Sequence, residues 1–215
     1  MERKNKPKRK YHSKRRQEQA RETRRRILAA AGKLFEEYGY AGATVEAIAE
    51  EAGVSPLTIY AAFGNKRSLL ADLLDVAVGG DDQPIPLLQR PGPQSVLQEK
   101  DPSEQIRRFA FDISGILERV APLFEIMGTA AKTEPEIAEM RVNILKERLR
   151  NIGVFVQHVA ANGGLREGLD EARAAEIVWA IASPEMYRLL TVDRGWSKEE
   201  FSQWLGDTLM RMLLG

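Results

Sequence analysis

The side chains with the clearest chemical potential lie in a short stretch, residues 55–63, where helical spacing separates an inner face from an outer one. Ile59 and Phe63, four residues apart, point inward. The side chains left outward are Leu57, Thr58, Tyr60 and Ala61. A short exposed helix that is second in a helix-turn-helix unit enters a DNA major groove. Helix pairs with a glycine turn also occur in all-α proteins that never touch DNA, so this stretch alone leaves both interpretations open.

The residues before this stretch predict how the outward face is positioned. A preceding helix has one apolar face that repeats at helical spacing: Val45, Ile48, Ala49 and Ala52. The Thr44 hydroxyl can cap the first turn of that helix, and Gly53 tolerates the positive φ of an abrupt helix end. Ser55 as N-cap and Pro56 at the first helical position then start the second helix at once. The pattern predicts a helix-turn-helix unit over residues 44–63.

The rest of the chain is also helical in its pattern, and no alternation typical of strands occurs. Residues 79–101 hold clusters of Gly, Pro and Asp without a sustained helical period, which is typical of a loop or linker. Pro122 predicts a break or kink in the helix that begins at Pro102. The predicted fold is all-α, a three-helix helix-turn-helix domain followed by a larger helical domain. Its expected parts are a basic disordered arm (1–20), the helix-turn-helix domain (21–78), a linker or loop (79–101) and the larger helical domain (102–215).

Composition excludes several classes of function. The chain of 215 residues has no Cys and two His, His12 and His158, so disulfides, thiolate chemistry and Cys- or His-based metal sites are not expected. No nucleophile elbow, phosphate-binding loop or zinc-protease motif occurs, so we expect neither an enzyme nor a cofactor. No apolar run approaches the roughly 20 residues of a membrane-spanning helix, and the charged N-terminus does not resemble a secretory signal.

Charge is distributed very unevenly along the chain. Residues 1–26 hold 13 Lys and Arg against three Glu, a net charge of +10, and the remaining 189 residues carry −9. A basic arm on a mildly acidic body is typical of a protein that meets a polyanion at one end. Two alternatives stay open at this point. The arm can be a solvated tail, or it can serve an architectural or RNA-binding protein without sequence preference.

Residues 44–70, TVEAIAEEAGVSPLTIYAAFGNKRSLL, closely resemble the DNA-binding domain of TetR/AcrR-family transcriptional regulators. The preceding FEEYGY, residues 35–40, fits the same pattern, and residues 193–214 are similar to the final dimer-forming helix of many members. The resemblance implies a homodimer that binds a palindromic DNA operator. It also implies a small apolar or amphipathic effector that releases the operator, commonly repression as output, and a place in the bacterial cytoplasm at the nucleoid.

The resemblance also implies roles for single residues. Thr44, Tyr60 and Lys66 would contact phosphates, and Ser55, Leu57 and Thr58 would face the groove. Many members carry bulkier or polar side chains where Ala61 and Ala62 stand, so this helix has little capacity for bidentate base reading. We therefore expect DNA shape, or arm residues in a minor groove, to add specificity. The expected DNA-binding residues are Arg24, Arg25, Arg26, Thr44, Ser55, Pro56, Leu57, Thr58, Tyr60 and Lys66.

Two further sets of residues are expected in the C-terminal half. Apolar groups from separate helices suggest an effector pocket, although aromatic and Met residues at helical spacing more often form a core. This expected set is Phe109, Ile113, Leu117, Phe124, Met127, Phe155 and Trp179, with Arg148, Gln157 and His158 as possible polar anchors. The apolar face of the last helix is the candidate dimer interface. Its residues are Trp204, Leu205, Leu209, Met212 and Leu213.

Overall fold

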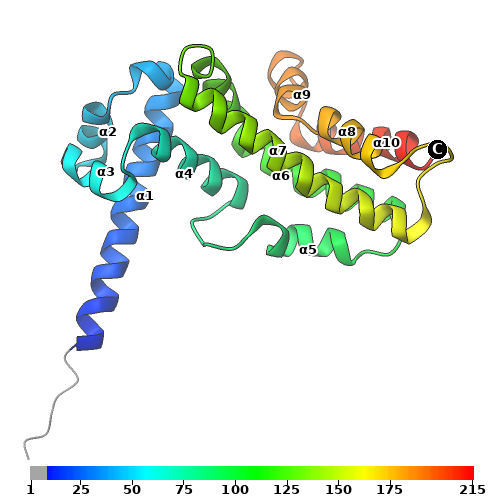
Figure 1. The fold of residues 1–215 in the computed structure, drawn as a ribbon, viewed down its shortest axis with the longest axis horizontal. Coiled ribbons are helices and arrows are strands. Elements are labelled where there is room, and N and C mark those ends of the chain that lie inside the picture. The colour runs from blue at the N-terminus through cyan, green and yellow to red at the C-terminus, as the bar shows by residue number, and fades with distance from the viewer. Residues whose placement is uncertain (1–8) are drawn as a thin grey trace, which may run out of the picture. The chain divides into compact units, whose positions relative to one another are not determined.

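A computed structural model describes residues 9–215, and every regular element in that range is helical, which confirms the all-α prediction (Figure 1). The α-helices are α1 (Arg9–Gly42), α2 (Val45–Ala52), α3 (Pro56–Phe63), α4 (Lys66–Gly79), α5 (Pro91–Gln98), α6 (Pro102–Ala130), α7 (Pro135–Gly163), α8 (Glu171–Ile181), α9 (Pro184–Arg188) and α10 (Lys198–Leu213). A 3₁₀ turn, η1 (Leu87–Gln89), precedes α5, and a π-helical turn, η2 (Leu189–Asp193), follows α9. In the described part of the chain, no helix combines the length and apolarity that crossing a membrane requires.

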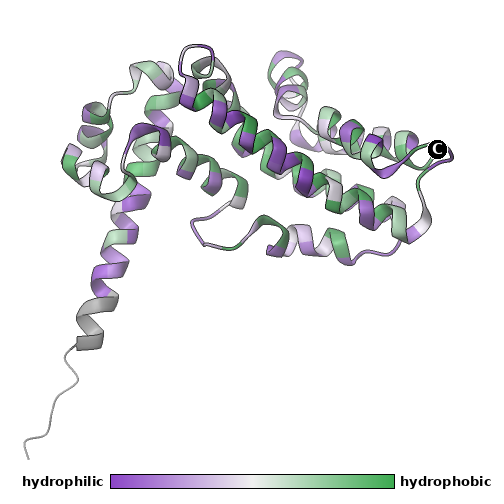
Figure 2. Cartoon of the chain, viewed as in Figure 1, coloured by the Kyte–Doolittle hydropathy of each residue, from purple (hydrophilic) through white to green (hydrophobic). Residues whose placement is uncertain are grey.

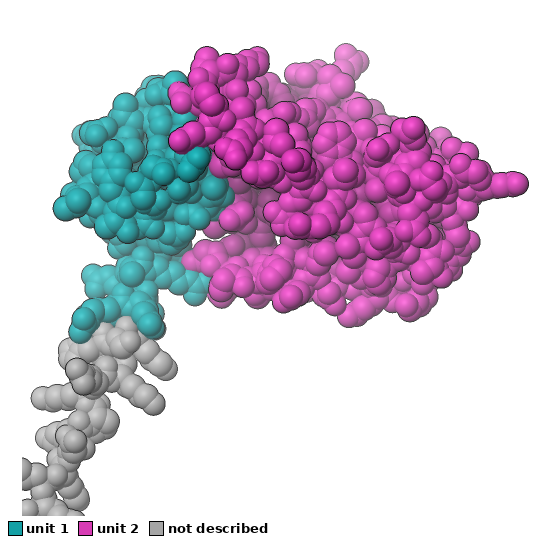
Figure 3. All heavy atoms as spheres, in the orientation of Figure 1, with its two compact units in different colours: residues 1–73 teal, residues 74–215 magenta. Residues whose placement is uncertain are grey.

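The chain folds into two compact units, residues 1–73 and residues 74–215 (Figure 3). The first unit holds α1 to α3 and the beginning of α4. Its core comes from one face of each helix, and the largest fully buried side chains are Phe35 and Ile27 of α1, Ile48 of α2 and Ile59 of α3. The short helices α2 and α3 are therefore held by tertiary burial, because isolated helices of eight residues are unstable in water.

The second unit is organised around the two long helices α6 and α7. Helix α10 and helix α5 pack on α6, and α8 packs on α7. Figure 2 shows hydrophobic and hydrophilic residues alternating along α6 and α7, as expected for helices that bury one side. The stacked rings of Phe109 and Phe155, with centroids 4.0 Å apart, join these two helices in the core.

The predicted disordered arm is wrong for residues 9–20, which form the first turns of α1. After Pro7 this stretch contains no Gly or Pro and is rich in Arg, Lys, Gln and Glu, all good helix formers. It can therefore extend the helix that residues 21–38 nucleate, without burying an apolar face. Residues 1–8 lie outside the described residues.

The predicted linker, residues 79–101, is wrong in part because it contains η1 and α5. Pro91 occupies the first turn of α5, where its missing N–H costs nothing, and Val96 is buried beside α6. Before it, the buried Arg90 guanidinium donates to the carbonyls of Gly79, Gln83 and Ile85 at 2.7, 2.9 and 3.1 Å. A segment without a helical period can thus still be ordered, because one buried guanidinium donates hydrogen bonds to several of its backbone carbonyls.

Of the break or kink expected at Pro122, the break does not occur, because α6 runs without interruption from Pro102 to Ala130; a kink stays a prediction. An interior proline removes one backbone hydrogen bond and crowds the preceding turn. Here the residues around it are buried, among them Val120, Leu123 and Phe124. Their packing keeps the helix continuous.

Candidate DNA-binding surface and effector cavity

Helix α3 presents an outer face to solvent while its inner face is anchored in the first unit. Ile59 is fully buried and Phe63 is 7% exposed, whereas Leu57 is 76% and Tyr60 is 46% exposed. Ala61 is exposed as well. The anchored helix therefore leaves Leu57 and Tyr60 accessible on one face.

The turn between α2 and α3 is fixed by its backbone and by two caps. The Thr44 hydroxyl accepts from the Ala47 N–H at 3.1 Å, and the Ser55 hydroxyl accepts from the Thr58 N–H at 3.2 Å. Gly53 has φ 64°, a left-handed conformation that glycine adopts without steric cost. These are the caps and the turn that the spacing predicted, and they fix the direction in which α3 leaves α2.

Several residues predicted to contact DNA already have partners within the first unit. The Lys66 ammonium donates to the Tyr40 carbonyl at 2.8 Å and lies 4.4 Å from the centroid of that ring. Ser55 and Thr58 share a hydroxyl–hydroxyl bond of 2.9 Å, and both lie at the start of α3. Their contacts with DNA stay predictions.

The predicted arm arginines Arg24 and Arg26 also hold the unit together. Arg24 forms an ion pair with Asp72 at 2.5 Å, and its guanidinium lies 4.3 Å from the centroid of the Phe63 ring. Arg26 donates to the carbonyls of Ala52 and Gly53 at 2.5 and 3.2 Å, where α2 ends. These contacts favour a structural role for both. Arg25, between them in sequence, is exposed, as Arg26 is, and also has a contact within the protein.

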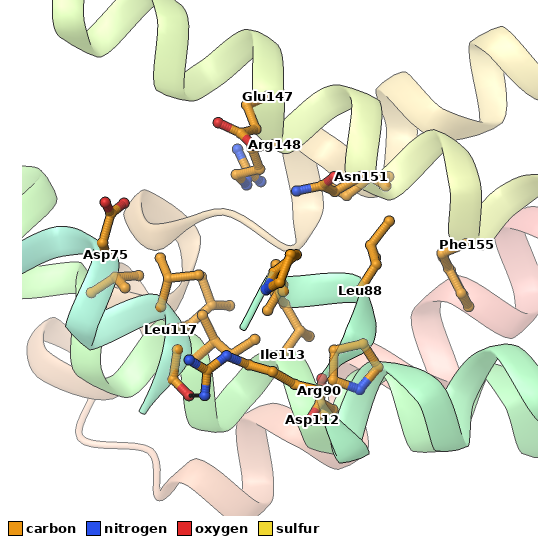
Figure 4. Close-up of a pocket in the computed structure, with 18 of the residues that line it drawn as sticks. Asp75, Leu88, Arg90, Asp112, Ile113, Leu117, Glu147, Arg148, Asn151 and Phe155 are labelled. Carbon is orange, nitrogen blue, oxygen red and sulfur yellow. Dashed lines mark hydrogen bonds between the residues drawn. The ribbon is translucent and has the colours of Figure 1, made fainter. Parts of the chain in front are cut away.

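The second unit contains a cavity of about 460 Å³ whose wall comes from α4, η1, α5, α6 and α7 (Figure 4). Five of the seven residues expected in an effector pocket lie on its wall: Phe109, Ile113, Leu117, Phe124 and Phe155. The other two do not. Met127 is fully buried in the core, and Trp179 donates its ring N–H to the Leu145 carbonyl at 3.3 Å. Of the possible anchors, Arg148 lines the cavity and Gln157 and His158 do not.

Polar side chains lie at two separated places on the wall. Figure 4 shows Glu147, Arg148 and Asn151 on one side, and Arg90 and Asp112 on the opposite side. Burial lowers the pKa of the Arg148 guanidinium to about 10, and the nearby Glu185 carboxylate offsets this only in part. Arg148 therefore stays charged at neutral pH in an unfavourable environment.

The second ionisable group of interest, Asp112, was missed by sequence reasoning. Burial raises the pKa of its carboxyl, and the Arg119 guanidinium acts in the opposite direction. A signal for it was present, because Asp112 lies three residues after Phe109 and four before Ile116, on the apolar stripe of α6. Arg148 shows the same signal on α7, four residues from both Ile144 and Ile152.

The predicted dimer interface needs correction. Leu205, Leu209 and Leu213 are fully buried within the protomer, on the face of α10 that packs against α6. The apolar stripe of α10 therefore marks the core of the unit and not a contact with a second chain. Trp204 is half-buried and Met212 is 37% exposed, so these two stay candidates. Sequence reasoning also missed the exposed apolar side chains Phe111, Val142, Leu189 and Val192, for which helical spacing gave no signal.

Comparison with known proteins agrees with this architecture. The sequence model described as "Bacterial regulatory proteins, tetR family" matches residues 27–73. The uncharacterised HTH-type transcriptional regulator YdeS of Bacillus subtilis (strain 168) is 28% identical over 168 residues, 78% of each chain. The TetR family transcriptional regulator PfmR of Thermus thermophilus is 27% identical, with a TM-score of 0.66 over 86% of this chain and 97% of PfmR.

A further structure is similar in fold at lower identity. NalD of Pseudomonas aeruginosa, described as the secondary repressor of the MexAB-OprM multidrug efflux pump, has a TM-score of 0.67 at 20% identity. The match covers 91% of this chain and 98% of that one.

A capped helix-turn-helix in one unit and an all-helical second unit agree with the helix-turn-helix transcriptional regulators to which the chain is similar. Residues 27–73 match the TetR family, and most of the chain is similar to TetR-family regulators. Members of this family bind DNA, act as dimers and bind small molecules, and they are typically repressors rather than enzymes.

Proposed function

We propose that this regulator binds a palindromic operator as a homodimer and releases it when a small apolar or amphipathic effector occupies the cavity. The observation that carries the proposal is the outer face of α3, on which Leu57 and Tyr60 are exposed while Ile59 and Phe63 hold the helix in place. We propose repression as the output and the bacterial cytoplasm, at the nucleoid, as the place of action.

The proposed DNA contacts divide into positioning and reading. Thr44, Tyr60 and Lys66 would position the protein on phosphates, which carry no sequence information. Leu57 and Thr58 would read the groove, mainly by apolar contact with thymine methyl groups. Ser55 and Pro56 would start the helix at the groove edge. Arg24 and Arg26 join the helices of the unit. We propose that Arg25, which is exposed on α1 and also has a contact within the protein, reaches the minor groove.

The proposed effector site rests on the size and lining of the cavity. A volume of about 460 Å³ lies within the range of roughly 300–1,000 Å³ typical of small-molecule sites. Its wall is mostly apolar, with a few polar groups that can orient a ligand. Leu74 and Val78 of α4 are part of the wall, and the same helix begins at Lys66 in the first unit. An effector that binds one conformation of the dimer better than the other shifts the population toward it.

Homodimerisation is proposed through the outward side of α10, where Trp204 and Met212 are accessible. A two-fold dimer would place two copies of α3 one helical turn of DNA apart, about 34–36 Å. Sedimentation of the full chain tests this directly. A monomer at the concentrations that saturate DNA would contradict the proposal.

The experiment that tests DNA reading is selection of bound sequences from a pool of random duplexes. We expect two inverted half-sites whose centres lie about 10 base pairs apart. Enrichment of no sequence would overturn the proposal and would favour the alternative, an architectural or RNA-binding protein that uses its basic helix without sequence preference. A parallel selection with Leu57→Ala, which removes an exposed side chain, should enrich the palindrome less strongly.

A further inference from the structure

The cavity wall carries one cation that is neither paired nor fully hydrogen-bonded. Arg148 donates through Nη2 to the carbonyls of Trp179 and Ala182, the latter at 2.9 Å, where α8 ends. Its Nε atom is completely buried and, within the described residues, has no acceptor. No carboxylate of residues 9–215 forms an ion pair with it, although its guanidinium lies 5.0 Å from the centroid of the Trp179 ring and the Glu185 carboxylate favours its charged form. A buried donor left without an acceptor is costly, and a buried charge without a counter-ion is more so.

The other charged groups on the wall have partners or lie away from Arg148. Asp75, on α4, has a contact of its own within the protein. Arg90 pairs with Asp81 at 3.0 Å and donates to three carbonyls. The Glu147 carboxylate accepts from Arg150 at 3.3 Å and is exposed to solvent. Asp112 lies on the opposite side of the cavity from Arg148, so the two do not neutralise each other (Figure 4). The charge on the α7 side that has no ion-pair partner is therefore the Arg148 guanidinium.

The groups next to Arg148 complete a polar end on an otherwise apolar cavity. Asn151, one turn further along α7, also lines the wall and offers an amide. Beyond them the wall is formed by apolar side chains such as Leu88, Ile113 and Leu117 (Figure 4). A guanidinium is suited to a carboxylate by its planar set of donors.

We propose that the effector is an anionic amphipathic molecule, a carboxylic acid with an apolar body, whose carboxylate pairs with Arg148 beside Asn151. This inference rests on the proposed effector function of the cavity and names the chemistry of its ligand. The apolar body extends over Leu88, Ile113 and Leu117 toward the side of Asp112.

Three probes that share one apolar body test the head group directly. Octanoate, octan-1-ol and octylamine are titrated calorimetrically into the full chain at pH 7. We expect octanoate to bind at least about ten-fold more tightly than octanol, and octylamine to bind most weakly, since a hydrogen bond to a charged group is the strong kind. Equal affinity for octanoate and octanol, tighter binding of octylamine, or no binding of any probe would each overturn the inference.

Variants then assign the preference to one residue. Arg148→Met should reduce octanoate affinity about ten-fold or more and leave octanol affinity within about two-fold. The matched control is Arg173→Met on α8, which removes an exposed arginine that does not line the cavity and should change neither affinity. Arg148 also donates hydrogen bonds to the end of α8, so the Arg148→Met variant can fail to fold. In that event Arg148→Lys tests the role of the charge, because it keeps the positive charge and should still bind octanoate more tightly than octanol. Loss of that preference in a folded Arg148→Lys would contradict the role of charge.

Release of the selected duplex by each probe is measured separately, which keeps this inference distinct from the proposed function. If octanol binds as tightly as octanoate and releases the duplex, the regulatory function stands and the anionic ligand is wrong. If octanoate binds through Arg148 and the duplex stays bound, the ligand chemistry stands and release by the cavity is wrong.

Discussion

Helix α3 and the cavity of the second unit differ in how far apart in the chain their residues lie. The whole outer face of α3 comes from residues 57–61, next to its own caps and turn. The wall of the cavity draws on residues between Leu74 and Pro184. A surface made from one contiguous segment is encoded by local spacing, whereas a cavity also depends on how distant helices pack. The two sites should therefore respond differently to mutation.

The largest expected change in stability comes from a mutation on the inner face of α3, compared with one on its outer face. Ile59→Ala removes a fully buried side chain and should destabilise the first unit by about 2–5 kcal/mol. Operator binding should be lost while octanoate still binds the second unit. Leu57→Ala is the matched change on the outer face and should alter stability by less than about 0.5 kcal/mol. Denaturant unfolding checks both variants, and equal destabilisation by the two would contradict the assignment of faces.

A smaller effect is expected where α3 begins. Ser55→Ala removes the hydroxyl that accepts from the Thr58 N–H and should cost about 1 kcal/mol. Ser55→Thr keeps an acceptor and is the control. Thermal unfolding of the first unit gives the comparison. An unchanged midpoint for Ser55→Ala would show that the cap does not stabilise this helix.

The contacts of Arg24 predict a change in stability rather than in sequence preference. Arg24→Met removes a partly exposed ion pair with Asp72 and a guanidinium–ring contact with Phe63, together worth about 1 kcal/mol after solvent screening. The selected palindrome should stay the same. Arg25→Met should instead weaken DNA binding, with a shallower salt dependence. If Arg24→Met selected a different palindrome, Arg24 would instead be assigned a contact in the minor groove.

The smallest effects concern pH and have opposite signs in two carboxyls of the second unit. Hydrogen bonds from the Gln83 N–H and from Arg90 lower the pKa of Asp81, so its contribution is present above the ordinary carboxyl pKa and is lost as pH falls through the lowered value. Burial raises the pKa of Asp112, so its charge reduces stability as pH rises from the ordinary value through the raised one.

Two isosteric variants measure these signs. Asp81→Asn should lower the unfolding midpoint at pH 7, and this difference should shrink as pH falls below about 4 toward the lowered pKa of the folded protein. Asp112→Asn should raise the midpoint at pH 7 and have little effect in acid. Midpoints recorded from pH 3 to pH 8 check both. Shifts of the same sign at pH 7 would contradict the difference between the two environments.

The sequence predicted features that depend on neighbouring residues better than features that depend on distant ones. The caps at Thr44 and Ser55 and the turn at Gly53 depend on neighbours within four residues, and the structure has them as predicted. The ordered segment before α5 was missed because Arg90 acts on carbonyls up to 11 residues away. The break expected at Pro122 was overridden by burial of the residues around it.

Apolar spacing predicts which residues are buried but not what covers them. Leu205, Leu209 and Leu213 were assigned to a dimer contact because a wide apolar face stood at the C-terminus, and α6 of the same chain covers it. Arg148 and Asp112 are charged residues within apolar stripes, and both line the cavity. A charged residue at an apolar position therefore indicated the cavity more specifically than the apolar residues did. The role of Arg24 and Arg26 depends on contacts 26 to 48 residues away, for which their own segment gave no signal.

The most direct test of DNA reading by α3 is a hydroxyl-radical footprint of the full chain on the selected duplex, with Leu57→Ala alongside. We predict two protected regions whose centres are about 10 base pairs apart, both weakened by Leu57→Ala, while Arg173→Met leaves them unchanged. Uniform protection along the duplex, or a footprint that Leu57→Ala does not alter, would contradict the account.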